Sequence, residues 1–102
     1  MDNFQALKGF TIIDVLQDPY FILLELSNTK RYKLKAIDTK WGIPVGIQSS
    51  DYINCLNGGK VISIKVYTYG SIRISTTTYK EFLIEPVISD GSNNTKLTIE
   101  EV

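Results

Sequence analysis

The side chains that could carry out chemistry are few in this sequence, and they are not grouped. There is no histidine, so the usual general base at neutral pH and the commonest metal ligand are missing. The single cysteine, Cys55, has no second thiol to pair with and no basic neighbour in sequence to stabilise a thiolate, which favours a buried structural thiol. The acidic residues are scattered, without a spacing typical of glycoside hydrolysis or of a calcium loop. We therefore expect no catalytic residues, no metal and no cofactor, and a protein that is not an enzyme.

Aromatic and basic residues interleave in one segment, which makes it the best candidate for a binding surface. Lys65, Tyr67, Tyr69 and Arg73 fall on the outward face of a predicted hairpin. Bases stack on such tyrosines in oligonucleotide-binding barrels, and tyrosine and arginine also dominate protein–protein interfaces. The alternative is ordinary cross-strand pairing, since tyrosine is a common strand residue. The segment does not distinguish a protein partner from a nucleic acid.

A second candidate surface is basic. Arg31, Lys33 and Lys35 alternate with apolar residues, so they share one face of a predicted strand and could meet phosphates or an acidic partner. The alternative is an exposed sheet face on which lysines prevent unwanted pairing. Eleven basic residues balance eleven acidic ones, and this neutrality favours the alternative and disfavours nucleic acid as the partner.

The only tryptophan, Trp41, lies in the least regular stretch, residues 39–50. An exposed tryptophan on such a loop would be a strong anchor for a partner. A lone tryptophan more often plugs one end of a small β-core while its indole N–H bonds a carbonyl. We expect the plug, and we keep Trp41 among the candidate partner-binding residues.

Alternation of apolar and polar residues dominates the chain and predicts a mainly β protein. It occurs in residues 11–16, 20–27, 31–37, 60–68, 71–78, 81–88 and 96–102. A short helix is expected at residues 2–8 and a helical turn at residues 51–56. Two glycines and a proline argue against a central strand in residues 39–50. We predict a single domain over residues 1–102, a small antiparallel barrel or sandwich of about six to seven strands.

One internal similarity suggests that the domain is a duplicated three-strand unit. Residues 7–15 align with residues 56–64 at an offset of 49, and each copy would be a glycine turn followed by three strands. The alternative is that strands preceded by glycine turns simply look alike. If the duplication is real, a pseudo-two-fold groove between the halves is the natural place for a ligand.

The N-terminal residues lack the layout of a secretory signal, and no apolar run approaches the roughly 20 residues that span a bilayer. Together with the unpaired cysteine, this favours a cytoplasmic protein away from membranes.

These features favour a non-catalytic protein-binding domain, most concretely a small inhibitor or immunity-type protein that sterically blocks a toxin or an enzyme. The alternative is a small-ligand or single-stranded nucleic-acid binding β-barrel module, whose binding would weaken steeply with salt. A homo-oligomer is compatible with both.

Overall fold

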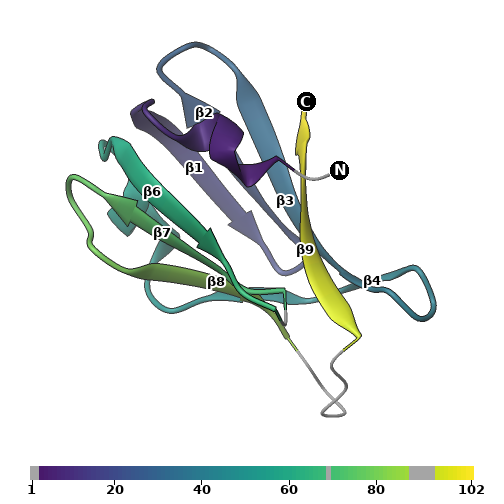
Figure 1. Ribbon diagram of the computed structural model, residues 1–102. Coiled ribbons are helices and arrows are strands. Elements are labelled where there is room, and N and C mark those ends of the chain that lie inside the picture. Colours follow the sequence, from purple (N-terminus) through teal and green to yellow (C-terminus); the bar gives the residue numbers. More distant parts are fainter. Residues whose placement is uncertain (1–2, 69, 88–93) are drawn as a thin grey trace.

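Two antiparallel sheets face each other across one hydrophobic core (Figure 1). The computed structural model describes residues 3–68, 70–87 and 94–102. The elements in chain order are η1 (Phe4–Leu7), β1 (Ile12–Asp18), β2 (Phe21–Leu26), β3 (Arg31–Asp38), β4 (Ile43–Val45), β5 (Ile47–Ser49), η2 (Ile53–Leu56), β6 (Val61–Val66), β7 (Ile72–Thr76), β8 (Phe82–Pro86) and β9 (Thr95–Glu101). The mainly β prediction is confirmed in its two-sheet form.

Strict alternation builds the core. Along β2, Ile22, Leu24 and Leu26 are fully buried while the residues between them are half-buried, and β3, β7 and β8 repeat this pattern. Because successive strand residues point to opposite faces of a sheet, this pattern leaves each sheet with one apolar face. Full burial of one such side chain contributes about 1.5–3 kcal/mol, so these inward positions hold the two sheets together.

The two halves of the chain exchange one strand each. The first sheet has the order β1-β2-β3-β4, and β9 pairs with the other side of β3. The second sheet has the order β5-β8-β7-β6. Strand β5 thus leaves the first half to pair with β8, with Ile47 opposite Pro86, and β9 returns to β3, with Leu97 opposite Ala36. Each sheet is completed by a strand from the other half.

Hydrogen bonds at the junction agree with the duplicated unit predicted from the sequence. Thr11 and Lys60, which align at the offset of 49, face each other in an antiparallel bridge. The Gly9 N–H donates to the Val61 carbonyl at 2.8 Å, and the Gly58 N–H donates to the Ile12 carbonyl at 2.7 Å. Such reciprocal bonds between equivalent residues define a pseudo-two-fold axis.

The same irregularity occurs in the first strand of each half. The pairing register shifts between Ile12 and Asp14 in β1 and between Val61 and Ser63 in β6. Each shift marks an extra residue, Ile13 or Ile62, and both side chains are exposed. The duplication therefore extends to the bulges.

Three details differ from the sequence prediction. The expected N-terminal helix is a single 3-10 turn, η1, and the helical turn at 51–56 is the shorter η2. Residues 39–50 hold two three-residue strands, β4 and β5, which raises the strand count to nine. Short strands fit there because Gly42 adopts a φ of +66° and the chain switches sheets after Val45.

Candidate protein-binding surfaces

The prediction that Trp41 plugs the core is wrong. Its side chain is 69% exposed, and Ile43 beside it is 52% exposed. The ends of the core are filled instead by residues of the 3-10 turns, such as Phe4 and Ile53. The duplication explains the error, because the second 3-10 turn, η2, fills space at the end of the core that Trp41 was expected to fill.

The turn that carries Trp41 is held by hydrogen bonds to the Asp38 side chain, within its own backbone and to the Asn94 carbonyl. The carboxylate of Asp38, at the end of β3, accepts the N–H groups of Lys40 at 2.8 Å and Trp41 at 3.3 Å. The Gly42 N–H donates to the Asp38 carbonyl at 2.7 Å, and Thr39 bonds the carbonyl of Asn94 through both its N–H and its hydroxyl. The Lys40 ammonium lies 5.3 Å from the centre of the indole ring. We call Lys40, Trp41 and Ile43 the tryptophan hairpin; it presents a fixed apolar surface to solvent.

The basic stripe on β3 is paired along its length. Arg31 lies 3.6 Å from Glu25 on β2, and Lys35 lies 3.1 Å from Glu100 on β9. The Lys33 ammonium sits 4.6 Å from the centre of the Phe21 ring. Because each cation already has a partner on a neighbouring strand, the stripe contributes to the outer face of the sheet rather than to a site for phosphates.

The aromatic and basic residues of the second sheet are brought together only in part. Lys65 on β6 is paired across the sheet with Arg73 on β7. Arg73 lies 3.4 Å from Glu81, while the Lys65 ammonium lies 5.2 Å from the centre of the half-buried Tyr67 ring. Tyr69 lies outside the described residues. Each described member of this group therefore has a neighbour within the same sheet.

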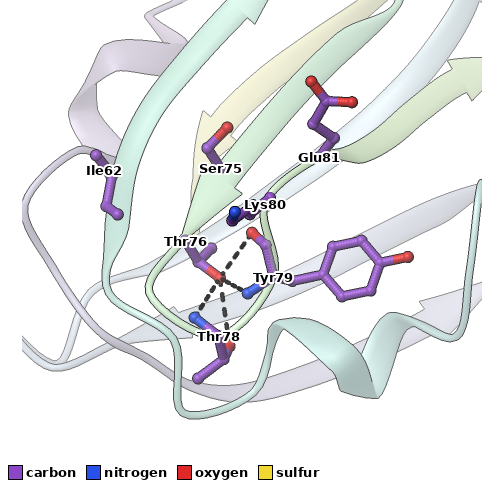
Figure 2. Close-up of a pocket in the computed structure, with 7 residues that line it drawn as sticks. All are labelled: Ile62, Ser75, Thr76, Thr78, Tyr79, Lys80 and Glu81. Atoms are coloured by element: carbon purple, nitrogen blue, oxygen red, sulfur yellow. Dashed lines mark hydrogen bonds between the residues drawn. The ribbon is translucent and has the colours of Figure 1, made fainter.

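An open depression of about 700 Å³ lies beside the β7–β8 turn, lined by Ile62, Ser75, Thr76, Thr78, Tyr79, Lys80 and Glu81 (Figure 2). The buried Thr76 hydroxyl lies at its centre. It accepts the N–H groups of Thr78 at 3.3 Å and Tyr79 at 3.0 Å, and it donates to the Tyr79 carbonyl at 3.3 Å. This hydroxyl is used to shape the turn, as threonine side chains often are in turns.

One side-chain pair with shifted pKa values ties this turn to η2. The Tyr79 hydroxyl donates to the Asp51 carboxylate at 2.8 Å, and the Tyr52 N–H donates to the same carboxylate at 2.7 Å. The Tyr52 amide and then the Tyr79 hydroxyl lower the pKa of Asp51, and the bond to Asp51 raises the pKa of Tyr79. Both shifts favour the ionised acid and the neutral phenol, so the pair fixes the turn at neutral pH.

A groove that the sequence analysis missed lies between β1 and η2. Its volume is about 570 Å³, and the exposed Leu16 and Tyr52 are among its lining residues. The residue that could have indicated this groove is Leu16. It follows Val15 in an expected strand, and no residue was expected to cover its side chain.

The place of Cys55 supports its expected structural role, and the expected absences stay predictions. Cys55 is half-buried and packs against the core. Within the described residues no group of three or more metal-ligating side chains is found, and no helix there is long and apolar enough to cross a membrane. No known protein family, curated protein or solved structure matches the chain.

Proposed function

We propose that this chain is a non-catalytic protein-binding domain. Its most concrete form is a small inhibitor or immunity-type protein that acts in the cytoplasm and covers a functional surface of a toxin or an enzyme. The observation that carries the proposal is the exposed Trp41 on a turn whose conformation is already fixed.

Exposure of this kind suits a protein interface. Tryptophan is the residue most often found among those that dominate binding energy, because its large ring gains much when a partner excludes water from it. A turn that is ordered before binding loses little conformational entropy on association. The neighbouring Ile43 extends the apolar area, and Lys40 supplies a charge at its rim.

The experiment is capture of a partner by tagged full-length chain from the host lysate, with and without nuclease, followed by calorimetry with the purified partner. Trp41→Ala should weaken binding about 30-fold or more, the loss typical of a residue that dominates an interface. Ile43→Ala should weaken it less. Ile62→Ala is the matched control, because Ile62 has the same side chain and the same 52% exposure on another strand.

Each outcome bears on the proposal. A stoichiometric protein that survives nuclease and is released by Trp41→Ala supports it. Equal losses for Ile43→Ala and Ile62→Ala would show that the tryptophan hairpin is not the interface. Capture that disappears with nuclease would favour the nucleic-acid module instead.

A further inference from the structure

The outer edge of β1 borders a groove that is suited to an extended chain. The groove separates β1 from η2 and is lined by Val15, Leu16, Gln17, Asp51, Tyr52, Ile53 and Asn54. Leu16 is 55% exposed and Tyr52 is 77% exposed, so two large apolar side chains border it. Strand β1 lies at the end of the strand order of its sheet, so among the described strands none forms a ladder with its outer side; β5 touches only its far end, where the Ser49 hydroxyl donates to the Gln17 side chain at 3.3 Å and the Ile47 N–H to the Pro19 carbonyl at 2.9 Å.

The backbone groups of β1 that point into the groove can be identified from the way β2 pairs with its two neighbouring strands. The Leu26 N–H donates to the Lys30 carbonyl, which places the even-numbered residues of β2 toward β3. The odd-numbered residues of β2 therefore bond to β1, where their partners are Asp14, Leu16 and Asp18. It follows that the N–H and C=O groups of Val15 and Gln17 point away from β2, toward the groove.

The equivalent edge in the other half is closed by a side chain. There the Gln5 side-chain amide of η1 donates to the Ile64 carbonyl of β6 at 3.2 Å. The pseudo-two-fold axis places Asn54 of η2 opposite Val15, and its side chain is one methylene shorter. Within the part of the chain that is described, the Val15 carbonyl has no hydrogen-bond partner, while its N–H is bonded to the Asp14 carboxylate at 3.0 Å. The duplicated edges thus differ in which group a side chain closes: the carbonyl of Ile64 in β6, and the N–H of Val15 in β1.

The charge at this edge is negative and is not neutralised. Asp14, Asp18 and Asp51 are exposed, and in the described residues none of these carboxylates forms an ion pair. Pairing of β1 with the β1 strand of a second copy would bring like charges together. An extended chain that carries lysine or arginine would bring opposite charges.

We propose that the groove beside β1 binds an extended segment of a partner protein as an added strand, in which apolar residues alternate with lysine or arginine. The carbonyl of Val15 and the main-chain groups of Gln17 pair with the segment, Leu16 and Tyr52 contact its apolar residues, and Asp51, the aspartate that lines the groove, contacts its cations. The occupant rests on the proposed protein-binding function, but the site is separate from the tryptophan hairpin.

The test uses the full-length chain and a capped synthetic peptide of alternating lysine and valine, with a glutamate and valine peptide as the control. Backbone amide exchange and chemical shifts are followed by nuclear magnetic resonance. The lysine peptide should slow exchange of the Gln17 amide, and this readout does not depend on any variant.

Gln17→Pro removes the N–H at the edge, where proline is tolerated, and should weaken the peptide about tenfold or more. Val66→Pro is the matched control, because Val66 is the equivalent edge position of β6; it should leave peptide binding unchanged.

Three results would overturn the inference. One is no binding of the lysine peptide up to about 1 mM, a free energy of only about −4 kcal/mol. The others are equal binding of the glutamate peptide, and a peptide-free dimer in which Gln17 is already protected. Trp41→Ala should not affect the peptide. If the peptide does not bind but the variants of the tryptophan hairpin still release a partner, only this inference is rejected. If the peptide binds but those variants do not release a partner, only the proposed role of the tryptophan hairpin is rejected.

Discussion

The two halves of the chain follow the same backbone plan, yet their outer faces differ in chemistry. The outer face of the first sheet carries Leu16, Phe21 and Leu23. The pseudo-two-fold axis places a lysine, a serine and an arginine at the equivalent positions of the second sheet: Lys65, Ser71 and Arg73.

The inward positions do not differ in this way. Buried aliphatic residues occupy both copies. The offset is 49 for Leu7 and Leu56 and for Ile12 and Val61, and the pairing registers make it 50 beyond the first hairpin turn, for Ile22 and Ile72, Leu24 and Ile74, Leu34 and Ile84, and Ile47 and Leu97. Packing restrains these positions, whereas the outer face is free to change. The two halves therefore differ in chemistry on their outer faces, and if the chain binds a partner as proposed, the apolar outer face of the first half is where the variants should act.

Truncation of the equivalent core leucines should give the largest loss of stability, and the same loss in both halves. Leu7 and Leu56 are fully buried, one in each 3-10 turn, so Leu7→Ala and Leu56→Ala should each cost about 3 kcal/mol through lost burial and a new cavity. Urea denaturation measures both. A loss in one variant with full stability in the other would show that the halves do not share the core equally.

Replacing two turn glycines by alanine should separate the cost of backbone strain from the cost of a steric clash. A β-carbon at Gly70 would lie 2.6 Å from the Lys96 Cα and 2.7 Å from the Thr95 carbonyl oxygen, and φ is +88°. Gly58 has a φ of +84° with nothing within 4 Å. Gly70→Ala should cost about 2–3 kcal/mol, and Gly58→Ala about 1 kcal/mol, since only the first adds contact with β9. Thermal unfolding compares them; equal losses would mean that β9 moves aside without cost.

The smallest effect should appear in the change of the free energy of unfolding with pH. It should arise from residues of the second half alone. Thr29 occupies in the first half the place that Tyr79 has in the second. The lowered pKa of Asp51 gives a contribution that is present above its ordinary value of 3.8 and is lost as the pH falls through the lowered value. The raised pKa of Tyr79 gives a contribution that is present below its ordinary value of 10.0 and is lost as the pH rises through the raised value.

Unfolding of the protein and of Asp51→Asn and Tyr79→Phe across the pH range tests this pair. Asp51→Asn should reduce the loss of stability at acid pH, and Tyr79→Phe should reduce the loss of stability at alkaline pH. Thr29→Val, at the equivalent position, should leave both losses unchanged. If Tyr79→Phe loses as much stability at alkaline pH as the unaltered protein, the hydrogen bond does not contribute.

The sequence was sufficient for the β class and the duplication because both are recorded in local patterns. Alternation such as that of β3 marks a strand with one buried face, and the glycines before β1 and β6 repeat with the offset. The exchange of strands between the halves could not be predicted from local sequence, because pairing of β5 with β8 depends on residues far apart in the chain. The short strands β4 and β5 were not predicted for the same reason: they are strands because of the strands they pair with, and their composition does not indicate it.

The candidate surfaces were predicted less well than the fold. Composition identified Lys65, Arg73 and the β3 stripe as cationic, but only the register shows that Glu25, Glu81 and Glu100 lie beside cations of these groups. The exposure of Trp41 depends on what fills the end of the core, which is a property of the whole fold. At the edges, Gln5 bonds the Ile64 carbonyl while Asn54, the residue at the same offset of 49, is one methylene shorter, a difference whose effect depends on the fold around each residue.

The pairing of β3 with β9 has a consequence for synthesis. Asp38 is opposite Thr95 and Tyr32 is opposite Glu101, so one side of β3 has no partner until residues 95–101 leave the ribosome. Contacts this distant in sequence form slowly, because the long loop between them must first be closed. During that interval the nascent chain presents an open strand edge, which is the kind of surface that aggregates and that chaperones shield. The lysines and arginine of β3 are the kind of residue with which natural sheets protect an unpaired edge, so the same side chains that pair across the finished sheet suit the waiting strand as well.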